Sequence, residues 1–289
     1  AVADAKAGKS GSESRNGRPR RGAGTAAGGP PSKKTAVDRA SARRARAGLG
    51  SAKSGDNVVA GVTISHPERV IYPDCGVTKL DLAKYYEKVA ERMLPFLVDR
   101  PLSVVRCVRG IGVGAGSQCF FQKHLRETFA APVKSIRVKE KSGTGDYIAV
   151  DSVAGLVTLV QMGVIEIHPW GSRAKDLEKP DILTFDLDPG EGVTFERIKE
   201  GVLEIRKLLK SDGLESFLKT SGGKGLHVQV ALKTGATWDE AKEYAGDIAR
   251  RLAADQPDKY VAIMTKAKRT GKIFVEYLRN GRGATSAAP

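Results

Sequence analysis

The sequence predicts an α/β (α+β) domain in which mixed sheets are flanked by helices. Short apolar runs bounded by turn residues are typical of strands, and longer segments with apolar residues at helical spacing behind a capping residue are typical of helices. The order of the two kinds of segment suits a mixed-sheet α/β or α+β domain. Hydrophobic residues make up 40% of the 289 residues, which is adequate for a core.

Helices are predicted where a capping residue precedes an apolar stripe. Thr78 with Asp81 and Thr237 with Glu240 have the i, i+3 spacing of a capping box, and Thr194 is the expected N-cap of another helix. The predicted helices run from 78 to about 96, over 152–162, over 195–210 and from 237 through 252. The predicted strands are 101–107, 146–150, 164–168, 181–188, 214–219, 226–232 and 273–278.

Residues 1–57 differ in composition from the rest of the chain. They are rich in Gly, Ala, Ser, Pro, Lys and Arg, with 13 Lys and Arg against 4 Asp and Glu, a net charge of +9. Such a segment cannot bury enough apolar surface to order itself. We therefore expect a basic disordered linker or tail at 1–57 and a folded domain at 58–289. The tail is either a solubilising spacer or a nucleic-acid tether.

The charge balance indicates an anionic partner. Lys and Arg outnumber Asp and Glu by 48 to 33, which favours nucleic acid. No run of 18 apolar residues is present, so we expect no membrane span, and the N-terminal residues do not resemble a signal peptide. Cys75, Cys107 and Cys119 are odd in number and scattered, so we expect free thiols in a reducing cytoplasm.

Two carboxylates stand at the end of a predicted buried strand. In the segment 181–190 (DILTFDLDPG), Asp186 and Asp188 lie two residues apart, so their side chains share one face of the strand, roughly 6.5 Å apart along the chain. Paired carboxylates repel each other and resist burial, so they favour a hard cation such as magnesium or manganese. The alternative is a pair of solvated acids before a Pro-Gly turn.

A glycine-rich loop follows within forty residues. In 220–225 (TSGGKG), three glycines let backbone N–H groups approach an anion, Ser221 and Lys224 add a hydroxyl and a cation, and His227 on the next strand can face the same space. The spacing is not that of a Walker A loop. The alternative is an ordinary turn.

Two titratable residues on predicted strands are ambiguous. Glu276 lies in the apolar strand 273–278, just after a basic cluster at 266–272 that includes Arg269. It could complete a metal site with the Asp pair, or it could lie on a solvated face. His168, before Pro-Trp, reads by default as a core histidine with satisfied hydrogen bonds.

Other residues suggest nucleic-acid contacts. Phe120 and Phe121 beside Lys123 could stack on bases, although such a pair is more often part of a core. Arg69 and Lys79 flank the turn at a helix start, where a phosphate could be held.

Three segments together carry a specific resemblance. Residues 186–190 (DLDPG), 221–227 (SGGKGLH) and 272–280 (KIFVEYLRN) resemble the three motifs of the archaeo-eukaryotic primase superfamily. The chain is more closely similar to the polymerase domain of bacterial ligase D, from about His66 to the C-terminus. This similarity also includes 119–124 (CFFQKH), 161–170 (QMGVIEIHPW) and 280–285 (NGRGAT).

The resemblance implies a primase-like catalytic domain with mixed, largely antiparallel sheets, two divalent metals (Mn²⁺ or Mg²⁺) and an NTP or dNTP substrate. The implied metal-binding and catalytic residues are Asp186, Asp188 and Glu276. The implied nucleotide-binding residues are His168, Ser221, Lys224, His227, Arg269 and Arg279, with His168 near the sugar. The implied DNA-binding residues are Arg69, Lys79, Phe120, Phe121 and Lys123, with Arg69 and Lys79 on a 5′-phosphate and the Phe pair at the template.

We therefore expect a template-directed nucleotidyltransferase, ribonucleotide-preferring, that fills gaps at DNA ends in non-homologous end joining. The implied partners are gapped or broken DNA, the Ku protein and an ATP-dependent DNA ligase domain, in the bacterial cytoplasm at the nucleoid. The alternative is a catalytically impaired module that binds 5′-phosphorylated breaks. A sugar-nucleotide transferase using Asp-x-Asp fits the basic balance and the Phe pair less well.

Two positions depart from the family pattern. The third motif acid is normally aspartate, and here it is Glu276. Family members continue with a further strand and a basic segment beyond the position of Pro289, so we expect the domain to be truncated.

Overall fold

The computed structural model describes residues 56–112, 119–127, 129, 131–233 and 235–289. All of these described residues belong to one compact unit, 52–289. The predicted tail at 1–57 thus lies almost wholly outside the described residues. Within the described residues, no helix is both long enough and apolar enough to span a membrane.

One of two five-stranded sheets carries the Asp-x-Asp strand at its centre. Its strand order is β11-β12-β10-β14-β13, and only β13 and β14 pair in parallel. The strands are β10 (Ile182–Pro189), β11 (Ser216–Thr220), β12 (Leu226–Ala231), β13 (Tyr260–Val261) and β14 (Ile273–Glu276). The prediction of mixed, largely antiparallel sheets is confirmed.

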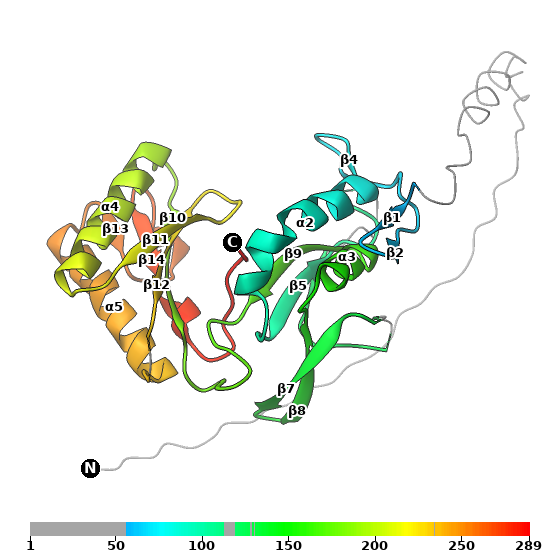
Figure 1. The fold of residues 1–289 in the computed structure, drawn as a ribbon. Helices are drawn as coiled ribbons and strands as arrows, with labels where there is room; N and C mark the ends of the chain where they lie inside the picture. The colour runs from blue at the N-terminus through cyan, green and yellow to red at the C-terminus, as the bar shows by residue number, and fades with distance from the viewer. Residues whose placement is uncertain (1–55, 113–118, 128, 130, 234) are drawn as a thin grey trace, which may run out of the picture. The chain divides into compact units, whose positions relative to one another are not determined.

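Two helices cover one face of this sheet: α4 (Phe195–Ser211) and α5 (Trp238–Asp255) (Figure 1). Both begin at the predicted N-caps, and α5 has the predicted capping box. Alternate residues of β10 face these helices and are fully buried with them in one core: Leu183, Phe185 and Leu187. Because strand side chains alternate, Asp186 and Asp188 must lie on the opposite face.

The second sheet is antiparallel throughout. Its strand order is β6-β5-β8-β7, and β9 pairs with β5. The strands are β5 (Leu102–Arg106), β6 (Phe120–Gln122), β7 (Lys134–Glu140), β8 (Gly143–Ala149) and β9 (Val164–Pro169). This sheet shares a core with the helices α2 (Lys79–Met93) and α3 (Val153–Gln161), and the α2 capping box is confirmed.

Short elements connect these layers. They are the hairpin strands β1 (Val58–Val59), β2 (Val62–Thr63), β3 (Val70–Tyr72) and β4 (Val77–Thr78), and the 3₁₀ turns η1 (Leu94–Phe96), η2 (Lys266–Lys268) and η3 (Leu278–Asn280). The short turn η3 directly follows β14, so it positions side chains just beyond the end of that strand.

The expectation of three free thiols was wrong. Cys107 and Cys119 form a disulfide with a Cα–Cα distance of 4.4 Å, whereas Cys75 is free and exposed. The strand register explains the disulfide. Arg106 on β5 lies opposite Phe120 on the antiparallel strand β6, so Cys107, one residue later, lies opposite Cys119, one residue earlier. The two cysteines are twelve positions apart in the sequence, and this spacing alone does not indicate the antiparallel pairing.

Candidate active site

The candidate site is a row of polar side chains across the five-stranded sheet. In register, Lys219 on β11 pairs with His227 on β12, His227 pairs with Asp186 on β10, and Asp186 pairs with Glu276 on β14. Directly paired residues of antiparallel strands point to the same face. The row therefore lies on the face away from α4 and α5, where the core leaves room for polar groups.

Three carboxylates converge in this row. Asp186, Asp188 and Glu276 each offer an oxygen, and these oxygens all lie within 4.8 Å of one another. Asp186 is only 3% exposed, and the other two are partly buried. The structure thus brings Glu276, 45 residues past the end of β12, to the pair that the sequence placed together.

The electrostatics of the three acids differ. Burial raises the pKa of Asp188, and the charge of Asp186 adds to this effect. Burial likewise raises the pKa of Glu276, against the opposing charge of Arg279. Burial alone would raise the pKa of Asp186 as well, but its interactions with His227 and Arg279 outweigh burial and keep that pKa below its usual value. The pKa is thus raised for Asp188 and Glu276 and lowered for Asp186 between them.

This donor set fits divalent metal ions. Carboxylate oxygens are the ligands that Mg²⁺ and Mn²⁺ prefer, and a cation would offset both the burial and the mutual repulsion that raise the pKa of Asp188 and Glu276. Two-metal sites hold their ions about 3.5–4 Å apart, a spacing that ligand oxygens within 4.8 Å of one another can span.

The glycine loop closes against the end of β10. A Cβ on Gly225 would lie 2.4 Å from the backbone oxygen of Leu187, so only glycine allows this approach. The Ser221 hydroxyl donates to the Gly225 carbonyl at 3.1 Å. On the other side, a Cβ on Gly190 would lie 1.7 Å from the Arg269 carbonyl oxygen. Both glycines permit close packing at the end of the strand that carries the acids.

A cavity of about 530 Å³ joins the loop to the acids. It is lined by Tyr72, Glu166, His168, Asp186, Asp188, Ser221, Gly222, Gly223, Lys224, Gly225, His227, Arg279 and Ala287. Its volume lies within the range of small-molecule and cofactor sites. Most of the residues implied for the nucleotide therefore share one space with the two aspartates.

His168 lies at this cavity rather than in a closed core. Its Nε2 is 2.9 Å from Oε2 of Glu166, and burial lowers its pKa although Glu166 opposes the shift. The exposed ring of Phe121 packs edge-on against the imidazole, with 5.7 Å between centroids. Sequence reasoning missed Glu166, although its spacing of two from His168 on one strand was a usable signal.

Arg279 is the most closely engaged cation of the cluster. Its Nε lies 2.7 Å from Oδ2 of Asp186 and 3.0 Å from Oε2 of Glu276. Nη1 donates to the Thr285 carbonyl at 3.2 Å. The turn η3 brings Arg279 back over the end of β14, which sequence spacing alone did not indicate.

Arg269 is not among the residues that line the cavity. Its guanidinium lies 3.8 Å from the centroid of the Phe274 ring and donates to the Met264 carbonyl at 2.6 Å. Lys123 is likewise engaged elsewhere, in an ion pair with Glu140 at 2.6 Å. These two cations would have to exchange partners to contact a nucleotide or DNA.

Lys79 and Arg69 form a second basic group at the start of α2. The Lys79 ammonium is buried and donates to the Ser65 carbonyl at 3.0 Å and to Oε1 of Gln161 at 2.8 Å. Burial, and next the charge of Arg69, lower the pKa of Lys79 to about 8. Arg69 donates to the Val108 carbonyl at 2.8 Å. Both cations are thus held in place before any anion arrives.

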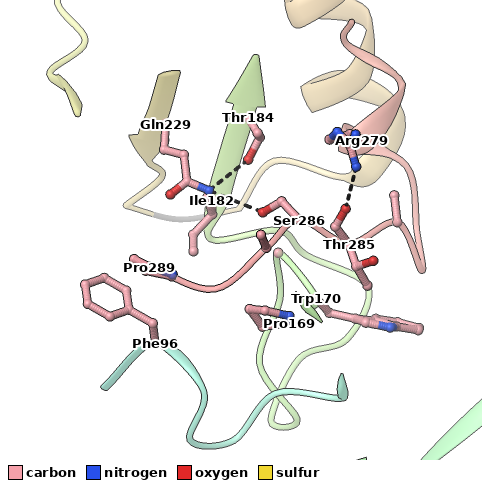
Figure 2. Close-up of a pocket in the computed structure, with 13 residues that line it drawn as sticks. Phe96, Pro169, Trp170, Ile182, Thr184, Gln229, Arg279, Thr285, Ser286 and Pro289 are labelled. Carbon is pink, nitrogen blue, oxygen red and sulfur yellow. Dashed lines mark hydrogen bonds between the residues drawn. The ribbon is translucent and has the colours of Figure 1, made fainter. Parts of the chain in front are cut away.

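A second, much smaller pocket holds no comparable chemistry. Figure 2 shows residues 284–289 passing between Pro169 and Trp170 on one side and Thr184 and Gln229 on the other. This pocket has a volume of about 20 Å³, enough for about one water molecule. The small pocket is therefore a gap in the packing of residues 284–289 against the residues on either side and not a ligand site.

Known proteins are similar to this chain in sequence and in fold. The family described as LigD, primase-polymerase domain matches residues 78–289. The chain is 40% identical over 247 residues to the multifunctional non-homologous end joining protein LigD of Pseudomonas aeruginosa, covering 86% of this chain and 28% of that protein. Identity to the multifunctional non-homologous end joining DNA repair protein LigD of Mycobacterium tuberculosis is 35% over 236 residues, covering 79% and 31%.

A solved structure agrees. The polymerase domain of Mycobacterium tuberculosis ligase D in complex with DNA superposes with a TM-score of 0.73 at 33% identity, covering 79% of this chain and 81% of that one. The fold and the site thus define a primase-polymerase class of domain. The chain belongs to the LigD primase-polymerase domain family. It spans less than a third of the length of the two curated relatives named above.

Proposed function

We propose that this chain is a template-directed nucleotidyltransferase that fills gaps at DNA ends during non-homologous end joining. The observation that carries the proposal is one cavity lined by Asp186, Asp188 and the Ser221–Gly225 loop, with Glu276 against the same carboxylates. A phosphate-cradling loop beside clustered carboxylates is what phosphoryl transfer needs. A module that only binds DNA ends would have no use for this convergence of acids.

The acids would hold two divalent ions. Those ions, when bound, lower the pKa of a primer 3′-hydroxyl and neutralise charge on the leaving pyrophosphate. Asp186, Asp188 and Glu276 position that chemistry at the end of β10.

The remaining lining residues would hold the nucleotide. Backbone N–H groups of the glycine loop, the Ser221 hydroxyl and the Lys224 ammonium suit a triphosphate. His227, whose Nδ1 is buried without a hydrogen-bond partner among the described residues, offers a further polar atom in the same row. His168, against which the Phe121 ring packs edge-on, would contact the sugar.

Replacing Glu166 with glutamine is expected to raise KM for the nucleotide about two- to tenfold, with a smaller change in kcat. The carboxylate at 2.9 Å fixes the His168 ring, and one such hydrogen bond is worth about 0.5–1.5 kcal/mol. Steady-state kinetics on a gapped duplex measure the effect. Glu91→Gln, at an exposed position on α2, is the matched control. If kcat falls by the same factor as KM rises, the result would count against a role of Glu166 in positioning His168.

Arg69 and Lys79 would bind the 5′-phosphate on the far side of a gap. Lys79 is the first residue of α2, where the helix dipole favours an anion, and Arg69 lies just before β3, with its carbonyl accepting the Lys79 backbone N–H at 2.8 Å. The exposed Phe120 and Phe121 would meet the template strand, with Lys123 released from Glu140 to a phosphate.

Lys79→Met should weaken binding to 5′-phosphorylated gaps about 10- to 100-fold, and binding to 5′-hydroxyl gaps much less. A hydrogen bond to a charged group is worth about 1.5–3 kcal/mol. Because the pKa of Lys79 is lowered to about 8, the ammonium loses its proton above that pH. The wild-type preference for 5′-phosphate should therefore decline as the pH rises from 7 to 9, as measured by fluorescence anisotropy.

The control for this measurement is Lys84→Met, at an exposed position on the same helix. It should weaken both substrates slightly and equally. If Lys79→Met also weakens both equally, Lys79 is a general electrostatic contact and the 5′-phosphate assignment is wrong.

The wider setting is part of the proposal. We infer a preference for ribonucleotides and manganese, action with the Ku protein and an ATP-dependent ligase domain, and a place at the nucleoid in the bacterial cytoplasm. The matched relatives are named as non-homologous end joining proteins.

Extension of a gapped, 5′-phosphorylated duplex tests this function, with NTPs or dNTPs and with manganese or magnesium. We expect the gap to be filled, fastest with NTPs and manganese. Tight binding of the duplex with no extension under any of the four conditions would leave only the end-binding role.

A further inference from the structure

The guanidinium of Arg279 lies among the metal-ligand carboxylates. Its Nε contacts two of the three acids, Asp186 at 2.7 Å and Glu276 at 3.0 Å. The side chain is about one-third exposed and lines the same cavity as Lys224 and Ser221. Arg279 therefore touches the acids on one side and faces the nucleotide space on the other.

A divalent ion on these acids would meet a strong repulsion. Metal–oxygen distances for Mg²⁺ and Ca²⁺ are about 2.0–2.6 Å, so an ion held by Asp186 and Glu276 would lie within a few Å of the guanidinium. Charges of +2 and +1 at that separation repel each other strongly in a partly buried site. Arginine cannot relieve this repulsion by losing its proton. It must move, or the metal must bind weakly.

The surroundings of Arg279 allow movement in one direction. Nη1 is held by the Thr285 carbonyl at 3.2 Å, so that end of the fork can stay in place while Nε leaves the acids. The cavity of about 530 Å³ lies beside it. A triphosphate in that cavity would offer oxygens that accept the released N–H groups, and Arg suits such oxygens well.

We propose that Arg279 is an internal counter-ion of the metal site, which divalent metal displaces and nucleotide triphosphate then accepts. In the absence of nucleotide, Arg279 competes with metal for Asp186 and Glu276. When a triphosphate occupies the cavity, Arg279 has another anionic partner and the competition ends. Metal and nucleotide therefore strengthen each other's binding, and by linkage the coupling is reciprocal. The coupling, but not the competition, rests on the function proposed above.

The test measures metal binding rather than catalysis. Mn²⁺ affinity of the full chain is determined by electron paramagnetic resonance, without DNA, in the absence and presence of a non-hydrolysable nucleoside triphosphate. Arg279→Met removes the charge and keeps the length of the side chain. Arg282→Met is the matched control, because Arg282 is ion-paired with Glu178 and bonds to none of the three acids.

Without nucleotide, Arg279→Met should bind Mn²⁺ at least about tenfold more tightly than the wild type, and Arg282→Met less than about threefold more tightly. With the triphosphate analogue, wild-type Mn²⁺ affinity should rise, and the rise should be much smaller in Arg279→Met. Arg279→Gln, which keeps a hydrogen-bond donor, should behave like Arg279→Met and serves if that variant does not fold.

Unchanged or weaker Mn²⁺ binding by folded Arg279→Met or Arg279→Gln would overturn the proposal, because Arg279 would then orient Asp186 for the metal. If Arg279→Met binds Mn²⁺ more tightly but its Mn²⁺ affinity still rises with the triphosphate analogue as much as in the wild type, the counter-ion role is supported. The transfer of Arg279 to the nucleotide is then overturned. Failure of the gap-filling function would leave the measurement without nucleotide unaffected, so the two failures are distinguishable.

Discussion

Asp186→Asn and Asp188→Asn are each expected to reduce nucleotide addition by at least about 10³-fold while leaving DNA affinity nearly unchanged. Each change keeps the shape of the side chain and removes a charge from the cluster of oxygens within 4.8 Å. A single electrostatic group in an active site is already worth about 10²–10³ in rate. An acid that holds catalytic metal should be worth at least as much. Removing negative charge should not weaken attraction to phosphates.

Single-nucleotide extension under enzyme excess measures the rate, and anisotropy on the same gapped duplex measures binding. Asp255→Asn, at an exposed position at the end of α5, is the matched control and should retain the parental rate. Extension by Asp186→Asn or Asp188→Asn at the parental rate would refute the metal-site assignment.

Glu276→Gln should also lose activity, on the order of 100-fold or more, whereas Glu276→Asp should match or exceed the parent. Register places Glu276 opposite Asp186, with its oxygen inside the same 4.8 Å cluster. Glutamate is longer than aspartate by about 1.5 Å, the length of one C–C bond. A displacement of about 1 Å at a reacting centre costs about 10²-fold in rate. Aspartate therefore shortens the third ligand and keeps its charge, whereas glutamine removes the charge.

The two variants should also differ in Mn²⁺ affinity, which separates a ligand from a nearby surface acid. We expect Glu276→Gln to bind the metal more weakly and Glu276→Asp to bind it at least as well. If Glu276→Gln extends primers as fast as the parent, Glu276 is not a metal ligand and the third-motif assignment fails.

Helix capping and the alternation of side chains along a strand were enough to predict several elements from the sequence. Thr78, Thr194 and Thr237 begin their helices where the capping pattern placed them. Asp186 and Asp188 share a strand face because side chains alternate. β7 (Lys134–Glu140) was not predicted as a strand, although it pairs with β8 in a tight local hairpin, because Val138 is its only buried residue and its exposed charged residues give no apolar alternation.

The contacts between site residues that are far apart in the sequence could be seen only in the structure. Only the pairing of β10 with β14 brings Glu276 to Asp186, and only the turn η3 returns Arg279 to the same carboxylate. The resemblance to the ligase D polymerase domain implied roles for both residues but did not indicate which side chains they contact. The Cys107–Cys119 disulfide escaped for the same reason, since its two halves meet only through the β5–β6 register.

The most direct test of the central claim is whether addition follows the template. A one-nucleotide gap with a 5′-phosphate is prepared with each of the four template bases and incubated with an equimolar mixture of NTPs and Mn²⁺. The site described here predicts that one nucleotide is added per gap, that it is complementary to the template base, and that Asp186→Asn adds none. Addition whose base does not change with the template, or no addition by the wild type to a duplex that it binds, would contradict the account.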